Sequence, residues 1–236
     1  MAFKHGKNSS VFVNHTDFSS YFNNVDVNRT ADVAESTTFG NDNKTYITGN
    51  KDGTLSVGGF FDATADATLQ PLLGGADMVF VIGIDGVDAT DGCSFAKGNI
   101  TNYGVSSPVG DIVATSLDIQ ADSGLFNGSV LENATVTATG SGTARDNTLS
   151  TANGGGAFII VSSASGTAPT LDAKITHSAD NTTYADLVTF TQATGQTSEV
   201  KEVAEGTTVN RYLKVEYTVG GTSPSFSVIV GFGRNN

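Results

Sequence analysis

The feature that most constrains the fold is a series of six short apolar runs in the last third of the chain. Apolar and polar residues alternate within the runs, and turn-forming residues separate them. Alternation with a period of two is typical of a strand with one buried face, and short strands at regular spacing favour a β-sandwich. The runs are AFIIVSS (157–163), TLDAKITHS (170–178), YADLVTFTQ (184–192), SEVKEVAE (198–205), NRYLKVEYTV (210–219) and SFSVIVGFG (225–233).

The composition supports many strands joined by turns. Among 236 residues there are 28 glycines, 4 prolines and no tryptophan, and Thr, Ser, Asn and Asp fill the spaces between apolar runs. Such residues favour tight turns. Cys93 is the only cysteine, so no disulfide can form within the chain. No segment approaches the roughly 20 apolar residues of a membrane-spanning helix.

Residues 44–62, KTYITGNKDGTLSVGGFFD, predict a β-hairpin. Tyr46 and Ile47 belong to the first expected strand, and GNKDG (49–53) is the expected turn because Asn and Gly tolerate positive φ. In the second strand the apolar residues Leu55 and Val57 alternate with polar ones, which predicts one buried face.

Residues 63–73 are the best candidate for a helix. Asp62 or Thr64 can cap its N-terminus, and Leu69, Leu72 and Leu73 form an apolar stripe. Gly74 and Gly75 end it, and Pro71 is expected to bend or shorten its last turn. The strongly apolar run MVFVIGI (78–84) then predicts a central strand.

Residues 141–157 predict a domain boundary. This stretch has very few apolar residues and contains a glycine triplet, as flexible linkers do. We therefore expect two domains, 1–145 and 146–236, the second a β-sandwich. The fold class predicted for the whole chain is mainly β with one short flanking helix.

The net charge of −12 is concentrated in the middle of the chain. Residues 52–144 contain eleven acidic residues and one basic residue, Lys97, whereas the segments on either side are close to neutral. Tight binding of DNA or RNA requires clustered Lys and Arg, so this distribution argues against a nucleic-acid clamp. It is compatible with a solvated acidic face or with a surface that repels polyanions.

The sequence offers few groups for catalysis. His5, His15 and His177 lie far apart in the sequence, and His177 is in phase with the apolar residues of its run, which predicts a half-buried position on a strand. Cys93 has no histidine near it in sequence, so we expect a buried, inert thiol. No phosphate-binding loop or dinucleotide fingerprint is present. We therefore expect no enzymatic activity and no cofactor.

One cluster has residues of the type that bind a cation. Asp85, Asp88 and Asp91 are spaced three residues apart in IDGVDATDG, and calcium takes oxygen ligands from loops of this kind. The spacing is not that of a helix–loop–helix calcium site, and no downstream Glu completes it. A solvated turn is therefore the favoured interpretation, with a metal site as the alternative.

The first 80 residues resemble the major tail, or tail-tube, proteins of long-tailed bacteriophages. The resemblance rests on MAFKHGKNSSVFV, on DFSSYF, and on ESTTFG followed by YITGNKDGTLSVGGFFD and a helix that ends in LLGG. The last third is similar to β-sandwich modules appended to phage virion proteins.

The resemblance implies two packed sheets flanked by a helix, and six subunits in each ring of a stacked tube. It implies a structural virion protein, made in the host cytoplasm, whose partners are copies of itself and other tail proteins. DNA would pass through the channel without tight binding. The residues expected at subunit interfaces are Phe3, Val11, Phe12, Val13, Tyr46, Ile47, Leu55, Val57 and Phe60.

Two alternatives remain at this point. The chain could be a capsid-decoration or host-adhesion protein that acts through its C-terminal sandwich. It could also be a β-sandwich carbohydrate-binding module or an enzyme with Asp/Glu pairs. The absence of Trp argues against a glycosidase, because it removes the largest aromatic platform for a sugar ring.

Overall fold

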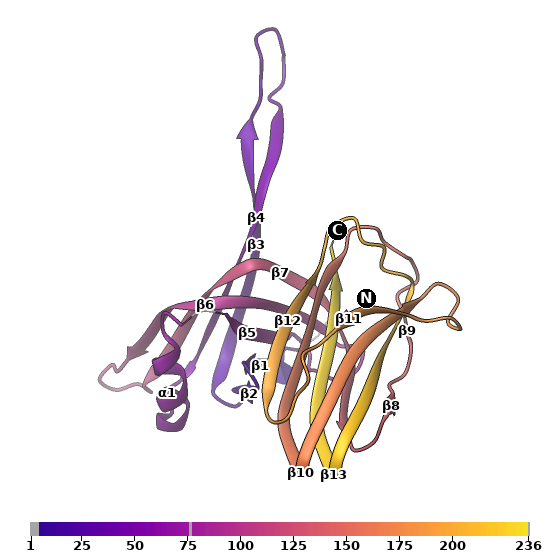
Figure 1. Ribbon diagram of the computed structural model, residues 1–236. Coiled ribbons are helices and arrows are strands. Elements are labelled where there is room, and N and C mark those ends of the chain that lie inside the picture. The colour runs from indigo at the N-terminus through magenta and orange to yellow at the C-terminus, as the bar shows by residue number, and fades with distance from the viewer. Residues whose placement is uncertain (1–4, 76, 236) are drawn as a thin grey trace. The chain divides into compact units, whose positions relative to one another are not determined.

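The computed structural model describes residues 5–75 and 77–235, and these residues are mainly β-strands (Figure 1). They contain one α-helix and two short 3₁₀ helices, and every pairing between their strands is antiparallel where a register is defined. The predicted fold class, mainly β with one short helix, is therefore confirmed.

The chain forms two compact units, and each of them uses separate stretches of the sequence. Unit 1 consists of residues 1–20, 78–96 and 126–236, and unit 2 of residues 21–77 and 97–125. Two long strands, β6 (Gly92–Ser106) and β7 (Ala114–Val136), contribute residues to both units. The predicted division at residues 145/146 differs from this one, because it falls inside unit 1.

Unit 1 is built around a long antiparallel ribbon of two strands, β10 (Gly155–Ser178) and β13 (Tyr212–Arg234). One half of the ribbon is bordered by β12 and by residues 129–136 of β7, and the other half by β11, β8 and β9. The remaining elements of unit 1 are η1 (Gly6–Asn8), β1 (Ser10–Val13), β2 (Thr16–Asp17), β5 (Met78–Gly83), β8 (Gly140–Ser141), β9 (Arg145–Asp146), β11 (Ala185–Thr189) and β12 (Thr197–Val203).

The ribbon changes register where its two halves meet. The pairing is irregular between Val161 and Thr170, and Gly166 and Gly221 have φ values of 115° and 102° there. Few residues other than glycine adopt such φ values without strain. Residues from both halves belong to one hydrophobic cluster, so the halves face each other as the two layers of a sandwich.

A second hydrophobic cluster lies on the other side of the first half of the ribbon. Ile159 and Val161 point into the sandwich, whereas Phe158 and Ile160 join a cluster that contains Phe95. The Phe95 ring lies 4.8 Å from that of Phe158 and 5.4 Å from that of Phe126, centroid to centroid. A strand buried on both faces is expected to be continuously apolar, which explains the run AFIIV.

All six predicted runs of the last third contain strand residues, but they form four strands because two pairs of runs merge into β10 and β13. The segment 141–157 is not a free linker. Ser141, Arg145 and Asp146 pair with β13, and Gly155–Ala157 are buried at the start of β10. A Cβ on Gly156 would lie 2.5 Å from the Phe126 ring, so glycine is needed here for close packing.

Unit 2 contains the hairpin of β3 (Phe22–Glu35) and β4 (Tyr46–Phe60), the helix α1 (Ala63–Leu69) and η2 (Gln70–Leu72). The Asp62 carboxylate caps α1 by accepting from the backbone N–H groups of Thr64 and Ala65 at 2.8 and 3.2 Å. The helix gives way to η2, which contains Pro71, as predicted. Leu69 is buried, but Leu72 is half-buried and Leu73 is exposed. Of the three leucines predicted to form a buried stripe, only Leu69 is fully buried.

Candidate assembly surface

The inner half of the β3–β4 hairpin is joined to the rest of the sheet through β7. Residues Thr54–Gly59 of β4 pair with β3 on one side, and residues Thr54–Phe60 pair with β7 on the other. Leu55 and Val57 are buried, as are their partners Ile119 and Leu117 on β7. The predicted alternation over residues 54–59 is confirmed, and it fixes the base of the hairpin.

The outer half of the hairpin is strands Arg29–Glu35 and Tyr46–Asp52, which pair only with each other. Figure 1 shows the two strands continuing together past their last pairing with β7 and ending in an open loop. All the side chains of this outer half are exposed. They include Val33, Tyr46 and Ile47, whose exposed fractions are 64%, 56% and 62%.

Polar contacts close the tip of the hairpin. The Ser36 N–H donates to the Thr45 carbonyl at 2.8 Å, and Lys44 forms an ion pair with Glu35 at 2.9 Å. The hydrogen bond from Lys44 lowers the pKa of Glu35, and Thr37 adds to this effect. Between these residues the Phe39 side chain is fully exposed.

The predicted position of the hairpin turn is wrong. GNKDG (49–53) lies inside β4, and the chain turns instead over residues 36–45. Pairing of residues 46–60 with residues 22–35 supplies more backbone hydrogen bonds than a five-residue turn can. The local turn preference of Asn, Asp and Gly is overruled for that reason.

A second group of exposed apolar residues lies at the opposite end of β4. Phe60 pairs with Ala114, the Phe61 N–H donates to the Val113 carbonyl at 2.9 Å, and both phenyl rings are exposed. Three more exposed apolar side chains lie nearby in sequence, Val105 at the end of β6 and Val109 and Ile112 in the loop between β6 and β7. Sequence analysis named only Phe60 of this group, although in SPVGDIV (107–113) Val109 stands between Pro and Gly, which favour an exposed loop.

Unit 2 therefore carries most of the exposed apolar side chains. Of the twelve large hydrophobic side chains that are exposed among the described residues, ten belong to unit 2. The ten are Val33, Phe39, Tyr46, Ile47, Phe60, Phe61, Leu73, Val105, Val109 and Ile112. Isolated exposed apolar residues are normal, but a concentration in one part of a molecule marks an interaction surface.

The structure divides the predicted interface residues into two groups. Tyr46, Ile47 and Phe60 are exposed, so a partner can reach them. Leu55 and Val57 lie in the core of unit 2, and β1, which holds Val11–Val13, pairs with β5 and β2 in the core of unit 1. These five residues therefore differ from the prediction, because strand pairing has already buried them. Phe3 lies outside the described residues.

The three aspartates considered for a metal ion form a turn. The Asp91 carboxylate accepts from the Asp88 N–H at 3.0 Å, and Asp88 is exposed. Over residues 5–75 and 77–235, no group of three His, Cys, Asp or Glu side chains is arranged to hold a metal ion.

Cys93 and His177 lie where the sequence predicts them. Cys93 is buried beside Phe95, and burial raises the pKa of its thiol to about 12. His177 is half-buried on β10, and its Nδ1 accepts from the Asn210 N–H at 3.2 Å. Burial lowers the pKa of His177, and the charge of Arg234 lowers it further.

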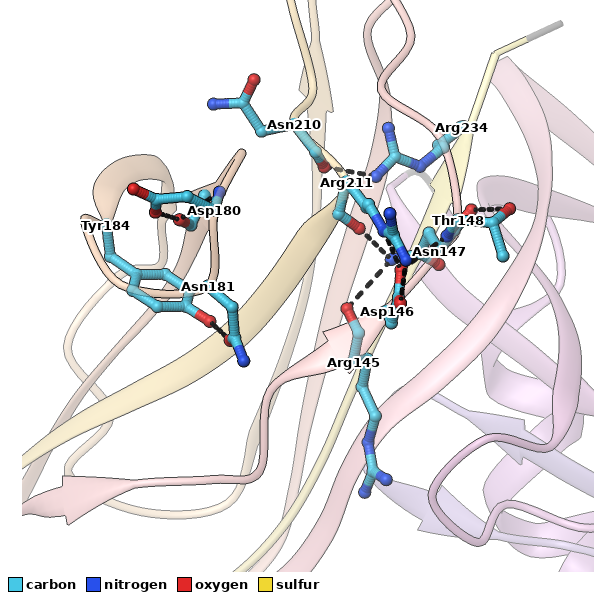
Figure 2. A network of polar contacts seen from close by, with 11 residues as sticks. Arg145, Asp146, Asn147, Thr148, Asp180, Asn181, Tyr184, Asn210, Arg211 and Arg234 are labelled. Carbon is cyan, nitrogen blue, oxygen red and sulfur yellow. Dashed lines mark hydrogen bonds and ion pairs between the residues drawn. The ribbon is translucent and has the colours of Figure 1, made fainter.

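Unit 1 carries a polar network at the start of β13 (Figure 2). Arg211 forms an ion pair with Asp146 through two contacts of 2.6 Å, and the Thr148 N–H donates to the same carboxylate at 2.8 Å. The hydrogen bonds from Arg211 and Thr148 lower the pKa of Asp146 to about 2. In the nearby turn, the Asp180 carboxylate accepts from Thr182 and Thr183, which lowers its pKa as well.

Arg234 ties the end of β13 to neighbouring loops. It donates to the carbonyls of Val209 and Asn210 at 2.6 Å. These contacts are structural, and they join the end of β13 to the segment that precedes its first residue.

None of the helices in the described part of the chain has the length and hydropathy required to cross a membrane.

No protein-family model matches the chain, and no curated protein matches it. Several solved structures share a weak likeness with the chain. A chain from the virion of a native gene transfer agent particle is 13% identical, with a TM-score of 0.42, over 52% of this chain and 97% of that one. The SPP1 tail tube is 11% identical, with a TM-score of 0.41, over 55% and 81%.

The third structure is the SPP1 Dit protein, described as a hub adsorption apparatus protein of phages that infect Gram-positive hosts. It is 11% identical, with a TM-score of 0.40, over 97% of this chain and 99% of that one. Likenesses with TM-scores below 0.5 do not determine function.

Proposed function

We propose that this chain is a structural subunit of a long-tailed phage tail and that it assembles with copies of itself through unit 2. The observation that carries this proposal is the concentration of exposed apolar side chains in unit 2. The resemblance of the first 80 residues to tail-tube proteins is the reason for proposing a tail as the assembly.

The outer half of the hairpin fits a role in assembly for a second reason. Each of its strands has one unpaired edge, since β3 and β4 pair only with each other there. Unpaired edges of long strands are sites where another chain can add backbone hydrogen bonds. Covering Val33, Tyr46 and Ile47 at the same time would remove apolar surface from water, worth about 25 cal/mol for each Å².

The finer features of the proposal come from the resemblance. Six subunits would form a ring, and stacked rings would form a tube that DNA passes through. The acidic residues of the segment 52–144 suit a channel wall, because carboxylates repel DNA within a Debye length of about 10 Å. In this proposal the protein belongs to the virion, contacts other tail proteins, and has no enzymatic activity or cofactor.

Electron microscopy of the purified protein, together with sedimentation velocity, tests the proposal. We expect rings or tubes, and a sedimentation coefficient that rises with concentration. A monomer at all concentrations, with no rings or tubes, would contradict it. Binding of that monomer to capsids or to a glycan would favour the decoration or carbohydrate-binding alternative.

A further inference from the structure

A hollow of about 380 Å³ lies in unit 1, beside β9. Thr90, Ser129 and Val130 line one part of it, and Arg145, Asp146 and Asn147 line another. The Thr90 N–H donates to the Val130 carbonyl at 2.8 Å, which holds the first of these parts together.

Arg145 is the cation of this hollow. Its backbone is held by pairing with Leu213, and its Nε donates to the Leu131 carbonyl at 3.1 Å. Figure 2 shows its guanidinium pointing away from the Asp146–Arg211 pair. No carboxylate of the described residues forms an ion pair with it, and NH1 and NH2 make no hydrogen bond within that part of the chain. These two nitrogens are therefore available donors.

The one carboxylate that lines the hollow already has partners. Asp146 accepts from Nε and NH2 of Arg211, both at 2.6 Å, and from the Thr148 N–H at 2.8 Å. Arg211 balances the charge of Asp146, which leaves the charge of Arg145 unbalanced in the hollow. The hydroxyl groups of Thr90 and Ser129 add possible donors to the same wall.

We propose that this hollow binds a carboxylate group. The NH1 and NH2 edge of a guanidinium presents two parallel N–H donors, which match the two oxygens of a planar carboxylate. A carboxylate fits better than a phosphate, because its single negative charge matches the single unbalanced charge of Arg145.

Two sources could supply the carboxylate. One is a small free carboxylic acid. The other is an acidic side chain of a second copy, since the chain has 24 acidic and only 12 basic residues. The second source rests on the proposed self-assembly, whereas the first does not.

Thermal melts in sodium acetate and in sodium chloride of equal ionic strength test the site. With 100 mM acetate and a dissociation constant of about 10 mM, the melting temperature should rise by about 3 °C relative to chloride. Arg145→Gln should abolish the rise, and Arg145→Lys should retain only part of it because a lysine lacks the planar fork. Arg29→Gln, which removes an exposed arginine of β3, should keep the full rise.

Circular dichroism checks that the Arg145→Gln protein is folded, and Arg145→Lys provides a second measurement if it is not.

A separate assembly measurement identifies the source of the carboxylate. Weaker self-association of Arg145→Gln, and of the unaltered protein in acetate, supports the site and assigns it to a second copy. Unchanged self-association with loss of the acetate effect supports the site and assigns it to a small acid. Equal melting in acetate and chloride, or a full acetate effect in Arg145→Gln, overturns the proposal.

Discussion

Unit 1 holds 37 of the 45 buried hydrophobic side chains found among the described residues, whereas unit 2 holds eight, none of them aromatic. The exposed large hydrophobic side chains are divided the other way, with two in unit 1 and ten in unit 2. Unit 1 thus buries its apolar residues within itself, on both faces of the β10–β13 ribbon. Unit 2 leaves many of them in solvent, which is the expected pattern for a part of the molecule that is completed by a partner.

The largest effect is expected in the core of unit 1. Phe95→Ala should lower the free energy of unfolding by about 3–5 kcal/mol, because it leaves a cavity between the rings of Phe126 and Phe158. Urea denaturation measures the loss. Leu149→Ala, which truncates an exposed side chain of the same unit, is the control and should change stability by less than about 0.5 kcal/mol. A loss below 1 kcal/mol for Phe95→Ala would show that unit 1 does not depend on this cluster.

The next effect concerns the smaller core of unit 2. Leu69→Ala should cost about 2–4 kcal/mol, since Leu69 is the buried leucine by which α1 is anchored. Leu73→Ala is the matched control, and because Leu73 is exposed we expect a change of less than about 0.5 kcal/mol. Equal losses for the two variants would mean that the helix is held by the whole predicted leucine stripe.

The pH dependence of stability separates the contribution of the Asp146–Arg211 ion pair from that of apolar packing in unit 1. The pKa of Asp146 is lowered to about 2 in the folded protein, against about 3.9 in an unfolded chain. A lowered pKa contributes stability above the unfolded value, and this contribution disappears as the pH falls through the folded value. Asp146→Asn should therefore be less stable than the unaltered protein above pH 4, with a difference that shrinks towards pH 2.

Chemical denaturation across this pH range measures that difference. Asp122→Asn, an exposed position in unit 2, is the control for a simple loss of net charge. A constant difference between Asp146→Asn and the unaltered protein from pH 7 to pH 2 would rule out the ion pair as its origin.

The same contrast explains which features the sequence could predict. The Asp62 cap, the effect of Pro71 and the buried strand Met78–Gly83 depend on neighbouring residues, and all three were predicted. The hairpin turn was misplaced because long-range pairing of β3 with β4 outweighs the turn preference of GNKDG. The glycines of 154–156 suggested a linker, but they serve close packing against neighbours far away in sequence. Of the exposed apolar side chains, sequence analysis named Tyr46, Ile47 and Phe60 as interface residues, and it did not name Phe39 or Val109.

The smallest effect on stability should come from the outer half of the hairpin, where the comparison between the units is most sharply tested. Val33 and Ile47 are exposed on two strands that pair only with each other, so replacing both with serine removes little buried area. We expect the free energy of unfolding of the monomer to change by less than about 0.5 kcal/mol. Self-association, measured by sedimentation velocity, should weaken strongly if a partner covers these side chains.

Thr48→Ser on the same stretch is the control for altered strand propensity. A large loss of monomer stability would mean that the outer half already has an apolar partner within unit 2. Unchanged assembly would move the contact to the other exposed group, around Phe60 and Ile112.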